Sequence, residues 1–85
     1  MAKILYFAWV REKMGRGEET LSLPDHITSV GDMLRHLDSL GEPYRSALAD
    51  PRLRIAVNQV HCRPEEPVGN GDEIAIFPPV SGGQG

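Results

Sequence analysis

The chain contains one long helical pattern, over residues 29–41, and this stretch limits the fold more than any other feature. Its apolar side chains recur at the spacing of one helix face: Val30, Met33, Leu34 and Leu37. Ser29 is suited to cap the first turn, Asp32 complements the positive helix end, and Gly41 provides a natural stop. A helix with one apolar face must cover another apolar layer, so the rest of the chain has to supply that layer.

Short β-prone runs surround this helix. The apolar run at residues 3–9 predicts a buried strand, and the alternating residues 18–23 predict a second strand that returns as a hairpin. Residues 10–14 between them are expected to form one irregular turn. Beyond the long helix, Pro43 opens a shorter helical segment that ends at residues 50–51. Three further strands are predicted, at residues 54–58, 60–62 and 73–77.

A chain of 85 residues is long enough for one domain only. The order of strand, strand, helix and then further strands predicts an α+β fold in which one main helix crosses one face of a mixed sheet. This is the ubiquitin-like β-grasp arrangement. We assign residues 1–80 to this domain. Residues 81–85 are rich in glycine and have nothing to pack into a core, so we expect a flexible C-terminal tail.

The composition excludes several classes of function. The formal net charge is −3 at pH 7 and no basic stripe is present, which argues against a nucleic-acid partner. No segment approaches the roughly 20 apolar residues that span a bilayer. The start of the chain does not resemble a signal peptide either, so we expect no membrane contact and a cytoplasmic location. The single cysteine, Cys62, excludes an internal disulfide.

The polar residues form no recognisable catalytic or metal-binding set. The three histidines are scattered, and the adjacent pair His61 and Cys62 would point to opposite faces of a strand, which makes a poor chelate. We therefore predict no metal site and no permanently bound cofactor. No nucleophile with a nearby base is visible, so the chain is not expected to catalyse a reaction alone.

The end of the chain carries the most specific motif. Residues 70–83 read NGDEIAIFPPVSGG, so the last strand runs through two prolines into a Gly-Gly pair. Two weaker motifs precede it in order, at residues 4–12 and 56–59. Over nearly its whole length the sequence resembles the small subunits of molybdopterin synthase, the MoaD family of sulfur carriers.

The resemblance implies a function for the Gly-Gly pair. In such carriers an E1-like enzyme uses ATP to adenylate the terminal glycine carboxylate, and a sulfur donor protein then displaces AMP to leave a thiocarboxylate. The reactive residue here would be Gly83, preceded by Gly82. The thiocarboxylate would donate sulfur to a pyranopterin precursor in molybdenum cofactor biosynthesis. The chain would thus be the non-catalytic, sulfur-donating subunit of a heterotetramer with two large subunits.

The residue types of the tail suit this task. Glycine has no Cβ, so it can thread a narrow channel into an active site. Pro78 and Pro79 stiffen the exit from the domain. If extended, residues 80–83 reach about 13 Å from the body, which places Val80 and Ser81 in contact with a partner.

The tail departs from the family pattern in one respect, because Gln84 and Gly85 follow the Gly-Gly pair. Three explanations are open: a protease removes both residues, the ending is not native, or the longer end is itself functional. We favour processing to Gly83. If both residues remain, the free carboxylate belongs to Gly85, about 7 Å further along the chain.

The alternation of the first and last strands predicts a docking face. If the helix covers Ile4, Tyr6, Ile74 and Ile76, the opposite sheet face carries Leu5, Phe7, Ala75 and Phe77. The resemblance implies that this face, with Phe7 and Phe77, packs on the large subunit, and Arg11 is expected to contact the partner at its rim. The alternative is that the central strands are buried on both sides.

Two rival functions stay open. The carrier could deliver sulfur to another pathway, such as thiamine or cysteine synthesis or tRNA thiolation. Alternatively, the chain could belong to a different class and be a non-carrier β-grasp interaction module with an inert tail. The two residues after Gly83 favour this alternative.

Overall fold

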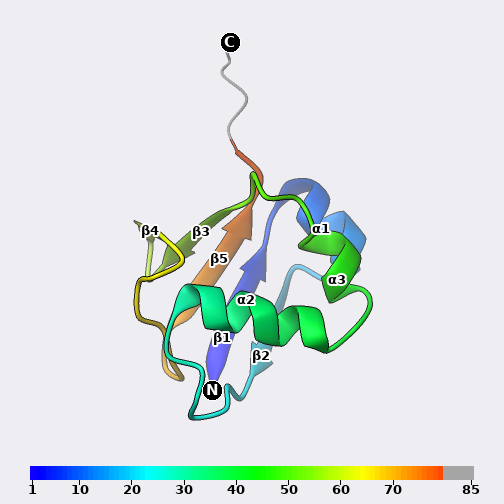
Figure 1. The fold of residues 1–85 in the computed structure, drawn as a ribbon. Coiled ribbons are helices and arrows are strands. Elements are labelled where there is room, and N and C mark those ends of the chain that lie inside the picture. Colours follow the sequence, from blue (N-terminus) through cyan, green and yellow to red (C-terminus); the bar gives the residue numbers. More distant parts are fainter. Residues whose placement is uncertain (80–85) are drawn as a thin grey trace.

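The computed structural model describes residues 1–79, which form one mixed sheet and three helices (Figure 1). Val80 and the predicted tail, residues 81–85, lie outside the described part of the chain. None of the helices described is long and apolar enough to cross a membrane. In chain order the elements are β1 (Ala2–Tyr6), α1 (Ala8–Met14), β2 (Glu18–Leu21), α2 (Val30–Ser39), α3 (Tyr44–Ala47), β3 (Arg54–Val57), β4 (Val60–Cys62) and β5 (Glu73–Phe77).

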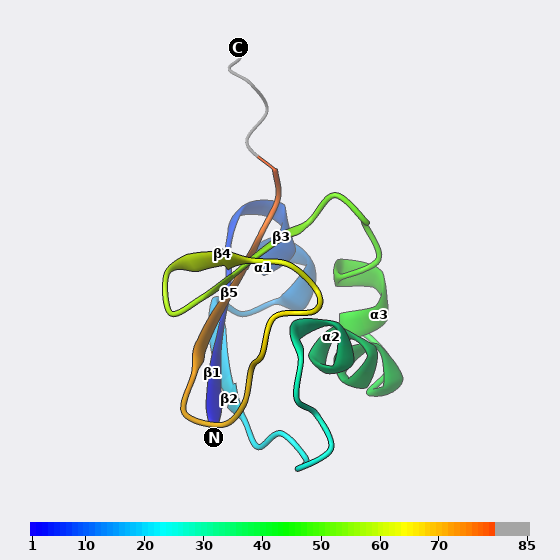
Figure 2. The same cartoon turned by 60° about the vertical axis from the view of Figure 1, so that its left-hand side comes forward.

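The five strands lie in the order β2-β1-β5-β3-β4. The central strands β1 and β5 are parallel, while β1 with β2, β3 with β4, and β3 with β5 are antiparallel. Helices α2 and α3 lie on the same side of the sheet, as Figure 2 shows. This confirms the predicted α+β, ubiquitin-like β-grasp fold with its main helix across one face.

The core lies between α2 and the sheet face that the sequence predicted. Ile4 pairs with Ile74 and Tyr6 pairs with Ile76 across the parallel strands, and all four residues are buried. From α2, three residues of the predicted stripe join this core, whereas Leu34 is only half-buried. The buried residues of the stripe are Val30, Met33 and Leu37.

Helix α2 begins where its capping residues predicted. The Ser29 hydroxyl accepts a hydrogen bond of 3.1 Å from the backbone N–H of Asp32. A hydrogen bond from the backbone N–H of Thr28 and a 2.6 Å ion pair with Arg35 lower the pKa of Asp32. Past the C-terminal end of the helix, Gly41 has a φ of 87°, a conformation in which glycine is favoured.

The first strand is shorter than predicted. β1 ends at Tyr6, so the strand expected through residue 9 is wrong. The chain turns out of the sheet at Ala8, whose φ is 55°. Ala8 and Trp9 continue the apolar run in the sequence but belong to the next helix. The prediction was wrong because nothing in this apolar run marks the turn.

The predicted irregular turn at residues 10–14 is also wrong, since these residues belong to helix α1. Val10 and Met14, four positions apart, are both buried and hold the helix against the core. Gly15 ends the helix in the left-handed conformation, with a φ of 76°. The pair of apolar residues one turn apart was the signal for this helix.

Strand β2 ends at Leu21 rather than at Leu23. The Asn70 side chain replaces the missing strand partner of Leu23: its amide accepts from the Leu23 N–H at 2.9 Å and donates to the Leu23 carbonyl at 3.0 Å. The loop at residues 69–72 is thereby tied to the end of the first hairpin.

One polar network links three elements on the helix side of the sheet. The hydroxyl of Tyr6 donates to the Glu19 carboxylate on β2, and the hydroxyl of Tyr44 at the start of α3 donates to the other Glu19 oxygen at 2.9 Å. Arg16 completes the network with a 3.0 Å ion pair to Glu19. Burial, and next the hydrogen bond to Glu19, raise the pKa of Tyr6 and of Tyr44.

Candidate functional site

The C-terminal ends of the neighbouring strands β1 and β5 lie side by side at one end of the sheet (Figure 1). Because the two strands are parallel, Phe7, which follows β1, and Phe77, the last residue of β5, both lie at this end. The backbone N–H of Phe7 donates to the carbonyl of Ile76 at 3.2 Å. Pro78 and Pro79 follow directly and are half-buried. The chain therefore leaves the domain from the two central strands, next to both phenylalanines.

The sheet face opposite α2 is apolar at its centre. Leu5 pairs with Ala75, and Ala75 pairs with Ala56 on β3, so these three residues form one row across the central strands. Ala56 is 6% exposed, while Leu5 and Ala75 are half-buried. Because two of the three are alanines and helices α2 and α3 lie on the other side of the sheet (Figure 2), the row is a shallow apolar surface. Together with Phe7 and Phe77, we call Leu5, Ala56 and Ala75 the open face.

Both phenylalanines lie where the alternation predicted. Phe7 is 47% exposed, one of the largest exposures of any large apolar side chain in the described residues. Phe77 is half-buried, because the ring of His61 on β4 packs against it edge to face, with centroids 5.4 Å apart. The alternative in which the central strands are buried on both sides is wrong for residues 1–79, since Leu5, Ala75 and Phe77 on this face are only half-buried.

The sequence reasoning missed the position of His61. It considered this residue only as a metal ligand with Cys62. The sequence did contain a signal for this position. A two-residue turn at Asn58 and Gln59 pairs Ala56 with His61, and paired residues share a face of the sheet, so the imidazole lies on the open face. In the described residues no group of three or more His, Cys, Asp or Glu side chains is arranged to hold a metal ion.

Charged residues surround the open face. Lys3 and Glu18 form a 3.8 Å ion pair at the β1–β2 side, and Arg54 lies opposite Phe77 in the pairing of β3 with β5. Arg11 is exposed on α1, and its guanidinium covers Gly17, the residue before β2. The predicted rim contact Arg11 thus stands at the same sheet edge as Phe7, on the side of β2.

The reactive end itself lies outside the described residues. This applies to the predicted contacts Val80 and Ser81, to the Gly82-Gly83 pair and to the two residues after it. The structure describes the chain up to residues 78–79, which follow β5 at the end of the sheet where the open face ends. We call these two residues the exit.

Comparison with known proteins extends this picture. The sequence pattern of the ThiS family matches residues 4–83. The molybdopterin synthase sulfur carrier subunit of Haemophilus influenzae is 39% identical over 83 residues, which cover 98% of this chain and 100% of that protein. The Escherichia coli subunit of the same name is 36% identical with the same coverage, and the human one is 35% identical over 95% of this chain and 92% of its own length.

Solved structures share the fold. SAMP1 from Haloferax volcanii superposes with a TM-score of 0.73 and 26% identity, covering 95% of this chain and 97% of that chain. The small archaeal modifier protein 1 of Methanosarcina acetivorans gives a TM-score of 0.72 at 27% identity, with coverage of 95% and 94%. The β-grasp arrangement is common to all of them, and the family match ends at residue 83.

Proposed function

Because this chain belongs to the ThiS family and full-length relatives at 35–39% identity are molybdopterin synthase sulfur carrier subunits, we propose that it is the sulfur carrier of a molybdopterin synthase. The observation that carries the proposal is the family match through Gly83, the second glycine of the terminal pair. The open face supports it, since it offers an apolar docking surface beside the exit of that tail.

The chemistry proceeds at the terminal carboxylate. In an E1-like enzyme the carboxylate of the last glycine attacks the α-phosphate of ATP and pyrophosphate leaves. This turns a poor electrophile into a mixed anhydride with AMP, which is a good leaving group. A sulfur donor protein then supplies sulfur and AMP leaves, so that one carboxylate oxygen is replaced by sulfur. The resulting thiocarboxylate is a stronger acid than a thiol and is therefore ionised at neutral pH. Its negatively charged sulfur is nucleophilic, as a thiolate is, and attacks the pyranopterin precursor.

In this proposal the reacting atoms act away from the domain. The open face docks on the large subunit, and residues 78–79 direct the chain into its active site. An extended stretch over residues 80–83 spans about 13 Å, which is enough to enter a pocket while the sheet stays outside. Two such carriers and two large subunits form the complex, and we place it in the cytoplasm, where ATP is available for activation.

We further propose that Gln84 and Gly85 are removed by a protease before activation. The end of the family match at residue 83 supports this. With both residues in place the carboxylate lies about 7 Å beyond the position that the partner sites accept.

One experiment tests the carrier function and the processing together. The full chain and a chain ending at Gly83 are incubated with an E1-like activating enzyme, ATP and a sulfur donor, and intact and fragment masses are recorded. We expect the exchange of one oxygen for sulfur on Gly83 of the shorter chain, and no exchange on the full chain. Exchange on Gly85 would overturn the processing step alone. No exchange on either chain, with an enzyme shown to be active on another carrier, would overturn the carrier function.

The pathway is tested with the thiocarboxylated chain. Mixed with the large subunit of a molybdopterin synthase and the pyranopterin precursor, it should lose its sulfur as the dithiolene forms. Sulfur transfer only to an acceptor of thiamine, cysteine or tRNA thiolation would assign the carrier to that pathway instead.

A further inference from the structure

The charged side chains of the open face are sorted along its strands. Near the start of β1 and β5, Lys3 pairs with Glu73, and both alternate onto the face that carries Leu5. Glu18 on β2 pairs with Leu5 and shares this face. Lys3 forms its 3.8 Å ion pair with Glu18, whereas Glu73 has no ion-pair partner among residues 1–79. Two carboxylates thus accompany one ammonium group, and we call these three residues the acidic end.

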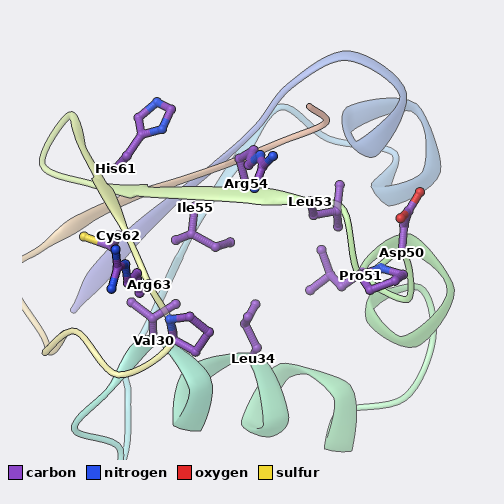
Figure 3. Close-up of a pocket in the computed structure, with 12 residues that line it drawn as sticks. Val30, Leu34, Asp50, Pro51, Leu53, Arg54, Ile55, His61, Cys62 and Arg63 are labelled. Atoms are coloured by element: carbon purple, nitrogen blue, oxygen red, sulfur yellow. The ribbon is translucent and has the colours of Figure 1, made fainter. Parts of the chain in front are cut away.

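The other end of the open face carries an arginine beside the exit. Arg54 pairs with Phe77, the last residue of β5, so the two side chains share a face of the sheet. Figure 3 shows Arg54 and His61 pointing away from α2, whereas Ile55 points toward it. Arg54 is exposed, and no carboxylate of residues 1–79 lies within ion-pair distance of its guanidinium. The open face is therefore positive where the chain leaves the domain.

The two charged ends are far enough apart to act separately. Glu73 and Phe77 are the first and last residues of β5, and at a strand rise of about 3.3 Å per residue they lie about 13 Å apart. The Debye length at physiological ionic strength is about 8 Å, so the negative end does not cancel the field at Arg54. Between the ends lies the uncharged row of Leu5, Ala75 and Ala56.

This order of charges supplies a directionality that the apolar row lacks. Burial of apolar area is non-directional, so a shallow row of small side chains can hold a partner without selecting its rotation. Opposite charges at two ends do select it, because a complementary partner rotated by half a turn meets like charges at both ends. The selection has a consequence for sulfur transfer, since only one orientation brings the exit to the entrance of the partner's active site.

We infer that the charge order of the open face sets the orientation in which the large subunit docks. The inference rests on the proposed function, which supplies the partner. The complementary surface carries an Asp or Glu opposite Arg54, beside the entrance for the tail. It carries a Lys or Arg opposite Glu73, about 13 Å away. Arg54 and Glu73 are thus specificity-determining residues that act together with the apolar contacts.

A double variant that reverses the charge order tests the inference. Arg54→Glu combined with Glu73→Lys exchanges the signs at the two ends and leaves the formal net charge of the chain at −3. The matched control combines Arg45→Glu with Asp38→Lys. It makes the same two changes at exposed positions of α3 and α2, on the other side of the sheet. The measured quantity is the association rate constant with the purified large subunit of a molybdopterin synthase, by surface plasmon resonance.

At a salt concentration of about 0.02 M, we expect the reversed variant to associate roughly tenfold more slowly than the parent, or more slowly still. The control should stay within about twofold of the parent. At about 1 M salt the Debye length falls to about 3 Å, so the difference between the reversed variant and the parent should shrink to less than about threefold.

Two neutral variants separate charge order from net charge. Arg54→Gln makes the chain one unit more negative, and Glu73→Gln makes it one unit less negative. Each should slow association about two- to fivefold at low salt, because each removes one of the two complementary contacts. If only net charge mattered, one variant would associate more slowly and the other faster than the parent. These variants also decide the question if thermal unfolding shows that the reversed variant is not folded.

Several results would overturn the inference. Unchanged association of the reversed variant, an equal loss in the control, or opposite effects of the two neutral variants would each exclude charge order as the determinant. A loss that persists in full at about 1 M salt would assign the effect to altered packing. Failure of the parent itself to bind the large subunit would instead overturn the docking under the proposed function, and this inference with it.

Discussion

Phe77 connects the body of the protein to its reactive end. It is the last residue of β5, it contacts His61, and the two prolines of the exit follow it. An aromatic side chain in this place serves two purposes, since it contributes to the open face and sets the point from which the tail leaves. For this reason the residue is the best single probe of the docking face.

Phe77→Glu should weaken the binding of the large subunit, because a carboxylate would be buried in an apolar contact without a partner. A cost of about 2 kcal/mol corresponds to a roughly 30-fold increase in Kd. Isothermal titration calorimetry with the purified large subunit measures it. Val60→Glu is the matched control, since Val60 is 65% exposed and lies off the open face. Equal affinity of the Phe77 variant and the parent would remove this face from the interface.

The turn between β3 and β4 holds two non-glycine residues in the left-handed conformation. Asn58 has a φ of 51° and Gln59 a φ of 71°. Asparagine adopts the left-handed conformation at little cost, whereas glutamine pays a steric cost for it. Asn-Gly is therefore the preferred residue pair for such a hairpin turn.

Gln59→Gly should therefore stabilise the protein by about 1 kcal/mol, measured as the free energy of unfolding in urea. Gln59→Ala keeps the Cβ and should bring no such gain. A loss of stability in the glycine variant would show that the Gln59 side chain contributes more than its strained backbone costs.

At the scale of elements, Glu19 joins β1, β2 and α3. Its carboxylate accepts from Tyr6 and Tyr44 and pairs with Arg16, and its side chain is only 9% exposed. The short helix α3 makes few other polar contacts with the sheet in the described residues, so this network fixes its position.

Glu19→Ala should cost about 2–3 kcal/mol of unfolding free energy, because it leaves the buried hydroxyl of Tyr6 without an acceptor. Glu18→Ala, one residue earlier on the exposed face of β2, should change stability by less than about 0.5 kcal/mol. Both values come from chemical denaturation. Similar values for the two variants would contradict a stabilising role for the network.

The same network predicts a dependence on alkaline pH. Burial and hydrogen bonding to Glu19 raise the pKa of Tyr6 above its ordinary value near 10, so the folded state holds this proton more tightly than the unfolded state. The stabilisation is fully present below pH 10 and is lost as pH rises above it. Denaturation between pH 8 and pH 11 should show a steeper loss for the parent than for Tyr6→Phe, and parallel curves would refute the assignment.

At the scale of the whole molecule, the described domain forms a complete core without residues 80–85. The core cluster lies within residues 1–79, on the helix side of the sheet. The open face lies on the other side of the sheet, and the last described residues, 78–79, lie where β1 and β5 end.

Deletion of residues 80–85 should therefore leave the free energy of unfolding unchanged within about 0.5 kcal/mol, while it abolishes the acceptance of sulfur. Thermal unfolding and mass spectrometry measure the two effects on the same sample. A large loss of stability would mean that the end of the chain packs on the domain, contrary to the separation proposed here.

Local patterns were enough to predict most elements and both sheet faces. The stripe from Val30 to Leu37, the cap at Ser29 and the stop at Gly41 depend on neighbours in the chain, so the sequence carries them directly. The tail motif was equally accessible, because its meaning depends on residue types rather than on contacts. This is why the family resemblance and the β-grasp fold were predicted correctly.

Only the tertiary structure decided where the first strand ends, that His61 packs on Phe77, and that Glu19 joins two strands to α3. The last two depend on residues far apart in the sequence: His61 contacts Phe77, and Tyr44 donates to Glu19. The first depends on packing, because the chain turns at Ala8 and the next helix buries Val10 in the core. Periodicity reports which side of an element is apolar, but which element covers that side is set by pairing and packing between distant segments. The sequence by itself therefore determined the chemistry of the tail, and the fold determined the surfaces that present it.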